Sequence, residues 1–177
     1  MRWRSTRTAA PPARSTEGDF DHGPHREAVR DDELRADVRA AADQLRKGEA
    51  TQVVSMGFCF GGRASLMQAS QESVDGVIAF YGPPTRGEEG GLTPLEEAQE
   101  GLVRVPVLGL YGGADQGIPT IEIEAYDVAL DAAGIEHRIV VYPDAPHSFF
   151  DRKMTEYADA CRDAWARVLG FIDSLQR

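Results

Sequence analysis

One cysteine stands in a setting that is typical of a nucleophile. Cys59 is the centre of the run Gly-Phe-Cys-Phe-Gly-Gly at 57–62, directly after the apolar run Val-Val-Ser-Met at 53–56. Flanking glycines are typical of a nucleophile elbow, a sharp strand-to-helix turn that lifts the central side chain clear of the sheet. A thiolate is a better nucleophile than a hydroxyl at neutral pH, and the N-terminus of the following helix favours its charge. The sequence therefore predicts a cysteine nucleophile at position 59.

Two further reactive residues follow later apolar runs. Asp115 comes after the run 106–111, and His147 comes after the run 138–142. The carboxyl ends of parallel strands meet at one edge of a sheet, where active sites of open α/β sheets gather. We therefore expect Cys59, Asp115 and His147 to lie together, in the chain order nucleophile, acid, histidine.

The acid has two alternative interpretations. Asp115 could instead cap a helix that begins at Pro119, since aspartate is a frequent N-cap residue. Asp144 lies three residues before His147 and is a rival for the acid, although its loop is short and favours a turn residue. The position of Asp115 directly after a strand favours it as the triad acid.

The elements that must position these residues alternate along the chain. Short runs of Val, Leu and Ile predict buried strands, and apolar residues at helical spacing between them predict helices. Such alternation indicates an α/β fold, a parallel sheet with helices on both faces. Asp31 and Asp32 are expected to cap the first helix, and Cys161 to pack on the apolar face of the last. The predicted strands are 51–56, 74–81, 106–111 and 138–142, and the predicted helices are 31–47, 61–70, 119–133 and 154–175, with a helical turn at 94–100.

Three loops together resemble the dienelactone hydrolase family, also called carboxymethylenebutenolidases. The elbow at 57–62 has the family pattern Gly-x-Cys-x-Gly-Gly, and the segments 111–119 and 142–150 match the family's acid and histidine loops in order. The resemblance covers residue 31 to the C-terminus. It implies an α/β-hydrolase-like sheet and a hydrolase that cleaves an ester or lactone without a metal or organic cofactor.

The chemistry that these residues support is acyl transfer. His147, oriented by Asp115, would generate the Cys59 thiolate, which attacks an ester or lactone carbonyl before water releases the acyl-enzyme. The Phe60 N–H follows the nucleophile directly and is the expected oxyanion donor, a contribution of about 3 to 4 kcal/mol.

The resemblance also implies how a substrate is held. The family's reference substrates carry a carboxylate that arginines bind, a task that suits the guanidinium group. Arg152 is the nearest candidate here, although the family arginine usually falls one residue earlier, where this chain has Asp151. Arg63 is a second candidate or else a solvated helix residue. Tyr81 and Ser148 are expected to line the pocket or to act structurally.

Composition excludes several classes of function. The 177 residues carry 19 basic and 29 acidic side chains, and the formal charge of -10 argues against nucleic acid or an anionic membrane as a partner. Without a secretory segment or a long apolar stretch, and with Cys59 and Cys161 in different elements, a cytoplasmic protein without a disulfide is expected. His22 and His25 lack the further ligands of a metal site, and His137 is expected at the surface.

The N-terminal segment raises a separate question. Residues 1–30 are predicted to be poorly structured or non-native, ahead of a catalytic domain at 31–177. The family has strands before the elbow strand that cannot be placed here, so strand 51–56 should form a sheet edge that invites self-association, although Val53 and Val54 suggest burial on both faces. A late start codon, a shortened protein or a partner chain would each explain this.

Two classes of function stay open. The first is a cysteine hydrolase for a small ester or lactone. The second is a catalytically weak or inactive fragment with a structural or interaction role.

Overall fold

A parallel sheet forms the centre of the molecule, which is described here by a computed structural model of residue 23, residues 28–151 and residues 153–176. Within these residues the sheet has four parallel strands in the order β1-β2-β3-β4. Helical segments connect successive strands, as parallel neighbours require. The predicted α/β fold with a parallel sheet is confirmed. The strands are β1 (Val54–Phe58), β2 (Gly76–Phe80), β3 (Val107–Gly112) and β4 (His137–Tyr142).

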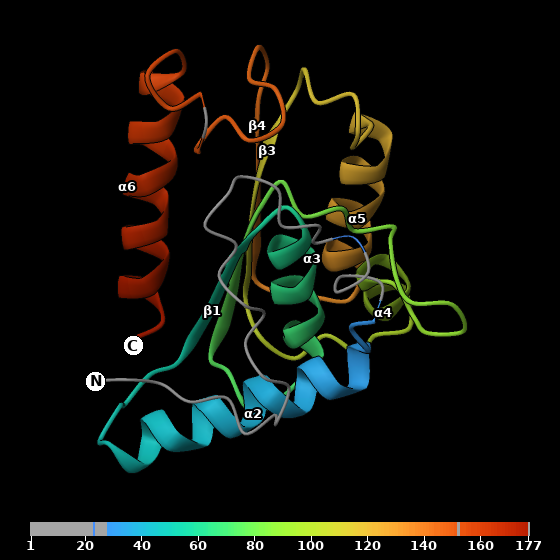
Figure 1. The fold of residues 1–177 in the computed structure, drawn as a ribbon, viewed down its shortest axis with the longest axis vertical. Coiled ribbons are helices and arrows are strands. Elements are labelled where there is room, and N and C mark those ends of the chain that lie inside the picture. Colours follow the sequence, from blue (N-terminus) through green and yellow to red (C-terminus); the bar gives the residue numbers. More distant parts are fainter. Residues whose placement is uncertain (1–22, 24–27, 152, 177) are drawn as a thin grey trace.

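Helices cover both faces of this sheet (Figure 1). The helix α6 lies on one face, whereas α3, α4 and α5 lie on the other. The helix α2 runs along the lower side of the molecule in this view: Arg46 in its last turn contacts Asp75 just before β2, whereas Asp31 in its first turn contacts Glu88 in the loop after β2. The helices are α2 (Asp31–Lys47), α3 (Phe60–Leu66) with the short 3-10 helix η1 (Met67–Ser70), α4 (Pro94–Gln99), α5 (Thr120–Ala132) and α6 (Ala158–Ser174).

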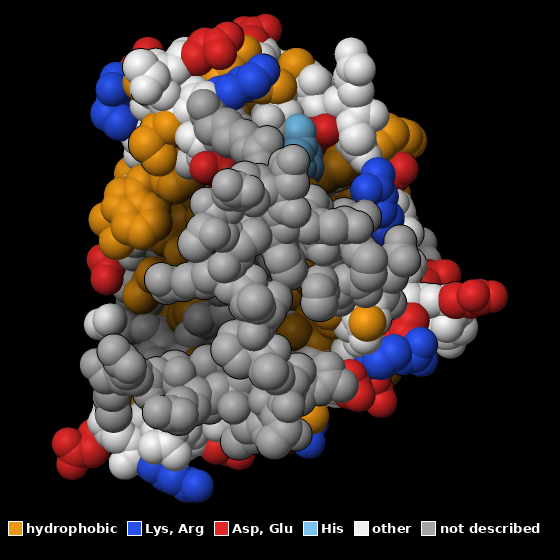
Figure 2. All heavy atoms as spheres, viewed as in Figure 1, with side chains coloured by type: hydrophobic (Ala, Val, Ile, Leu, Met, Phe, Trp, Pro, Cys, Tyr) orange, Lys and Arg blue, Asp and Glu red, His pale blue; other side chains and the backbone are white. Residues whose placement is uncertain are grey.

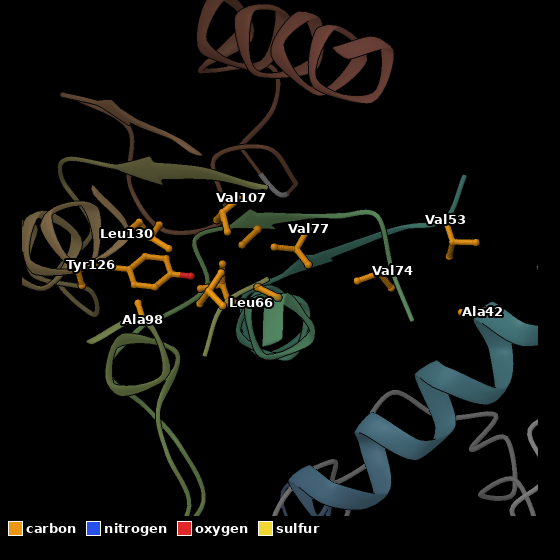
Figure 3. Close-up of a cluster of buried hydrophobic side chains, with 13 residues drawn as sticks. Ala42, Val53, Leu66, Val74, Val77, Ala98, Val107, Tyr126 and Leu130 are labelled. Atoms are coloured by element: carbon orange, nitrogen blue, oxygen red, sulfur yellow. The ribbon is translucent and has the colours of Figure 1, made fainter. Parts of the chain in front are cut away.

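The two faces of the sheet carry separate hydrophobic cores. Because side chains alternate along a strand, Val77 and Ala79 of β2 belong to the core on the α3 side, and Ile78 and Phe80 to the core on the α6 side. Figure 3 shows the α3-side core, into which Tyr126 of α5 points. Every residue of β2 and β3 is buried, which agrees with their nearly continuous apolar sequences.

The first strand lies closer to the cysteine than predicted. It begins at Val54 instead of residue 51 and continues to Phe58. The Asp75 carboxylate accepts a hydrogen bond from the Val53 N–H at 2.7 Å, and the Asp75 N–H donates to the Val53 carbonyl at 2.7 Å. These contacts hold the chain just before β1, so the ladder with β2 starts at the pair Val54 and Gly76.

Two helix starts also differ from the prediction. Arg30 is the N-cap residue of α2 and makes no side-chain cap, while Asp31 and Asp32 lie in the first turn, where acidic groups favour the helix dipole. The helix α6 begins at Ala158 instead of residue 154, because residues 148–151 and 153–157 form turns with local backbone hydrogen bonds. Its buried face contains Cys161, Ala164 and Val168, as the apolar pattern predicts.

The prediction of a surface position for His137 is wrong. Its side chain is 9% exposed at the start of β4. The ring nitrogens contact the Ile135 carbonyl at 2.7 Å and the Asp127 carboxylate at 3.1 Å. Since Asp127 belongs to α5, the imidazole fastens this helix to β4.

The strand β1 is an edge of the sheet within the described residues, because it pairs with β2 alone. Met56 is 44% exposed and Phe58 is 39% exposed, both large values for apolar residues of a strand. The expected burial on both faces holds for Val53, which is 7% exposed, but Val54 is only half-buried. The expectation of an edge strand agrees with the sheet as described.

Apolar side chains of α6 continue this surface. Trp165 is 44% exposed and Leu169 is 49% exposed. The ring of Phe150 bridges the two elements, since it lies 6.1 Å from the Phe58 ring and 6.2 Å from the Trp165 ring. Figure 2 shows hydrophobic side chains gathered on the α6 side of the molecule. We call Met56, Phe58, Trp165 and Leu169 the edge patch.

Candidate active site

The cysteine lies on a strained turn between β1 and α3. Cys59 has φ 54° and ψ -115°, a backbone conformation that residues other than glycine rarely adopt. Its N–H donates to the Phe80 carbonyl at 3.0 Å. The turn is tight: a Cβ on Gly57 would lie 1.9 Å from the Gly61 carbonyl oxygen, and one on Gly62 would lie 2.6 Å from that of Phe80. Gly57 and Gly62 of the predicted elbow are therefore required by close backbone contacts.

The aspartate and the histidine form a hydrogen-bonded pair beside this turn. The Asp115 Oδ2 atom lies 2.6 Å from His147 Nδ1, and the Asp115 side chain is 3% exposed whereas that of His147 is 37% exposed. Asp115 does not cap α5, because its other oxygen accepts the Gly117 N–H at 2.8 Å and the N-cap residue is Pro119. The rival acid Asp144 is exposed.

The loops that carry this pair are joined through their backbones. The Gly113 N–H donates to the Tyr142 carbonyl at 2.7 Å, and the Ala114 N–H donates to the Ala145 carbonyl at 3.0 Å. A Cβ on Gly112 would lie 2.2 Å from the Ala145 carbonyl oxygen. This contact explains the glycine at the end of β3, and it fixes the distance between the two loops.

A pocket of about 980 Å³ lies over these loops. Cys59, Asp115 and His147 all contribute to its lining, as does Phe60. Phe60 is the first residue of α3, and N–H groups in the first turn of a helix lack intrahelical acceptors. The structure thus brings together the four residues on which the sequence prediction rests, in one open pocket.

One of the two predicted arginines also lines the pocket, but it is already paired. Arg63 is 8% exposed, and its guanidinium donates to both carboxylate oxygens of Asp31 at 2.7 and 2.9 Å. The same guanidinium lies 5.5 Å from the centre of the Phe60 ring. The alternative of a solvated helix residue is therefore wrong, because the ion pair joins α3 to the start of α2.

Comparison with known proteins identifies the family. The profile of the "Dienelactone hydrolase family" matches residues 13–175, which is most of the chain. The chain belongs to the dienelactone hydrolase family. A protein of Methylorubrum extorquens named "Putative carboxymethylenebutenolidase" is 36% identical over 146 residues, 79% of this chain and 50% of the relative. A protein of the same name from Escherichia coli K12 is 33% identical, over 80% of this chain and 54% of the relative. The chain spans about half the length of these curated relatives.

Solved structures agree with the dienelactone hydrolase fold. A crystal structure titled "Putative Dienelactone Hydrolase" from Klebsiella pneumoniae is 33% identical and matches with a TM-score of 0.72, over 81% of this chain and 61% of that chain. A thermophilic esterase of Thermogutta terrifontis matches with a TM-score of 0.59 at 17% identity, over 81% of this chain and 67% of that chain, a likeness of fold alone.

The other predicted substrate residues are placed less directly. Tyr81 is 1% exposed with φ 40°, and its ring centre lies 4.9 Å from that of His147. Its hydroxyl has no hydrogen-bond partner among the described residues, and burial, followed by the Asp151 charge, raises the pKa of this hydroxyl well above its usual range. Tyr81 and Ser148 are absent from the described lining of the pocket, and Arg152 lies outside the described residues.

Sequence reasoning missed several residues in and beside this pocket. The loop 82–93 forms one wall, and its Glu88 accepts the Asp31 N–H at 2.9 Å and forms an ion pair with Arg30. Phe80 and Phe150 stack beside Phe58 next to the elbow. No sequence signal marks these contacts, because the polar loop has no periodicity and its partners lie far away along the chain.

The part of the chain that the structure describes contains neither a metal-binding cluster nor a membrane-spanning helix. There, no group of three or more His, Cys, Asp or Glu side chains is arranged to hold a metal ion. No described helix combines the length and the apolar character needed to cross a bilayer. His22 and His25 lie outside the described residues, as does most of the predicted segment 1–30.

Proposed function

We propose that this chain cleaves a carboxylic ester or lactone through Cys59, His147 and Asp115, by way of a covalent acyl-enzyme. One observation carries the proposal: a strained elbow cysteine shares a pocket with a hydrogen-bonded aspartate and histidine. A nucleophile, a base and a group that orients the base are the three parts that acyl transfer needs. Membership of the dienelactone hydrolase family supports the same reaction class.

The proposed first step forms a thioester. Asp115 accepts a hydrogen bond from the Nδ1–H of His147, which leaves Nε2 free to take the thiol proton of Cys59. The thiolate attacks the carbonyl carbon, and the Phe60 N–H donates to the oxyanion. When the carbon–oxygen bond breaks, the His147 imidazolium returns its proton to the leaving alkoxide.

The proposed second step releases the acid. His147 takes a proton from a water molecule, whose oxygen attacks the thioester carbonyl carbon. The carbon–sulfur bond breaks, the carboxylic acid leaves, and Cys59 regains its proton from His147.

Both cysteines of the chain are free thiols, in agreement with the reducing cytoplasm proposed as its location.

The pocket favours a small substrate that carries a negative charge. Arg30 and Arg63 are neutralised by Glu88 and Asp31, whereas Lys153 of the same pocket forms no ion pair with a described carboxylate. The relatives named carboxymethylenebutenolidases support this choice. Arg152, which the family resemblance suggests, stays a second proposed ligand of the carboxylate.

A second role is favoured by the edge patch. We propose that a second copy of the chain binds there, so that two β1 strands pair antiparallel about Met56. The strand Val-Ser-Met-Gly-Phe contains no charge and no proline, the devices that usually protect edge strands. Twofold pairing about Met56 would place Val54 opposite Phe58 and keep apolar side chains on the same face. This contact would also serve a fragment with an interaction role.

Activity toward a small activated ester tests the hydrolase. The wild-type chain should hydrolyse p-nitrophenyl acetate, and both Cys59→Ala and iodoacetamide should abolish turnover. Mass spectrometry after a rapid acid quench should find one acetyl group on the peptide that contains Cys59. The control is Cys161→Ser, because Cys161 is buried and donates to the Phe149 carbonyl at 3.3 Å, away from the pocket lining. A folded wild-type chain without turnover or acetylation would favour the interaction role instead.

A further inference from the structure

The loop 82–93 between β2 and α4 is fastened to three other parts of the molecule. The Thr85 hydroxyl donates to Glu122 of α5. The Glu88 carboxylate accepts the Asp31 N–H at the start of α2. Between these two anchors, Arg86 reaches the loop that carries Asp115. The backbone on both sides of Arg86 is therefore held in place, although its side chain is exposed.

Arg86 begins a chain of hydrogen bonds that ends at the histidine. Its Nη2 atom donates to the Gly117 carbonyl at 2.7 Å. The Gly117 N–H donates to Asp115 Oδ1 at 2.8 Å, and Asp115 Oδ2 lies 2.6 Å from His147 Nδ1. The two oxygens of Asp115 thus have different partners, and the Gly117 peptide fixes the rotation of the carboxylate.

Gly117 leaves little room for this arrangement to vary. A Cβ at this position would lie 3.2 Å from Asp115 Oδ1, so the backbone approaches the carboxylate closely. The N–H and the carbonyl of Gly117 belong to the two peptide groups on either side of its Cα. Arg86 holds the peptide group that contains the Gly117 carbonyl, and this limits the movement of the peptide group that contains the Gly117 N–H. Such restraint is needed because glycine has the most flexible backbone.

The other described pocket arginines are used differently. Arg63 pairs with Asp31, and Arg30 pairs with Glu88. Arg86 instead has a backbone carbonyl as its partner, and no described carboxylate neutralises it. Its contact is therefore directional, and the atom that it holds is two hydrogen bonds away from the proposed base.

We propose that Arg86 is a positioning residue, which holds the Asp115 loop through Gly117 and keeps His147 in its reactive orientation. The inference rests on the proposed hydrolase function. The role is distinct from binding a substrate carboxylate, because it applies equally to esters without charge.

The experiment compares Arg86→Met and Arg86→Lys with Arg104→Met. Arg104 is a matched control, since it is also exposed and donates to a backbone carbonyl, that of Gly101 at 2.6 Å, but lies outside the pocket lining. With an uncharged ester, Arg86→Met should lower kcat about tenfold, roughly the value of one hydrogen bond, and leave KM within about twofold. Arg86→Lys should recover most of kcat, because an ammonium group can donate to the same carbonyl. Arg104→Met should change neither constant.

Two other outcomes would overturn the inference. An unchanged kcat in Arg86→Met would do so, and so would a rise in KM confined to carboxylate-bearing esters, which would make Arg86 a substrate ligand. Urea unfolding measures the stability of Arg86→Met and Arg104→Met. A loss of stability that both variants share is a general effect and not a change in the positioning of His147.

A readout without turnover separates this inference from the hydrolase itself. In proton NMR, the His147 Nδ1–H that is bound to Asp115 should give a far-downfield signal, which Asp115→Asn removes. Arg86→Met should broaden or shift this signal, and Arg104→Met should leave it unchanged. If the wild-type chain shows the signal but hydrolyses nothing, the proposed function fails while the positioning role is still decided by the signal. An identical signal in wild type and Arg86→Met refutes the positioning role.

Discussion

At the scale of single residues, the elbow depends on glycine at a position where a side chain would not fit. Gly62 contacts the backbone of β2 so closely that a Cβ would lie 2.6 Å from the Phe80 oxygen and 2.9 Å from the Gly82 Cα. Gly61, its neighbour in α3, has no atom within 4 Å of the same point. Adjacent glycines therefore differ in their role: one permits close packing and the other faces open space.

Gly62→Ala should lower the free energy of unfolding by about 1 to 3 kcal/mol, the usual cost of overpacking, because backbone atoms cannot move aside cheaply. Gly61→Ala should leave stability unchanged or raise it slightly, since alanine favours helix. Urea unfolding followed by circular dichroism measures both variants. Equal stabilities would contradict the close contact at Gly62.

The acid of the proposed triad gives a second prediction at this scale. Asp115→Asn keeps the size of the side chain but removes the charge that would stabilise the His147 imidazolium, so kcat should fall about 10²- to 10⁴-fold. Asp144→Asn is the matched control, because Asp144 is exposed in the histidine loop. Steady-state hydrolysis of an activated ester measures both. A larger loss in Asp144→Asn would reverse the assignment of the acid.

At the scale of elements, the sequence predicts what is local and periodic. The strands β2 and β3 follow from apolar runs, and Cys59, Asp115 and His147 follow from their positions after strands. Contacts between distant polar residues leave no such pattern. Asp31 contacts Arg63 across 32 residues and Glu88 across 57, and the second contact depends on the fold of an aperiodic loop.

The ion pair between α2 and α3 gives a testable prediction about how these two helices are held together. Asp31→Asn leaves the Arg63 guanidinium buried without its counter-charge, so the free energy of unfolding should fall by about 1 to 3 kcal/mol. Asp159→Asn is the control, because Asp159 and Arg162 form an exposed pair on α6, with side chains 92% and 73% exposed, and no measurable change is expected. Chemical denaturation at neutral pH measures the free energy of unfolding of both variants. A loss of the same size in both variants would mean that the burial of Arg63 does not matter.

At the scale of the whole molecule, net charge opposes self-association, whereas the exposed apolar surface favours it. The formal charge of -10 repels a second copy, whereas the edge patch offers Met56, Phe58, Trp165 and Leu169 for contact. Salt screens the repulsion and leaves the hydrophobic attraction, so self-association should increase with ionic strength. The edge itself was expected from the sequence, but the contribution of α6 was not, because Trp165 and Leu169 flank a helix face whose other residues are buried.

Met56→Lys should therefore shift the chain from dimer to monomer, because a charged lysine on an edge strand opposes pairing with a second edge. Size-exclusion chromatography with light scattering, at low and high salt and at several protein concentrations, measures the mass directly. Val128→Lys is the matched control: Val128 is 66% exposed on α5, on the opposite face of the sheet from α6, and the same added charge should leave the dimer intact. If Met56→Lys and Val128→Lys weaken association equally, the β1 edge is not the contact between the two copies. If the wild-type chain stays monomeric at high salt and high concentration, the edge patch does not bind a second copy.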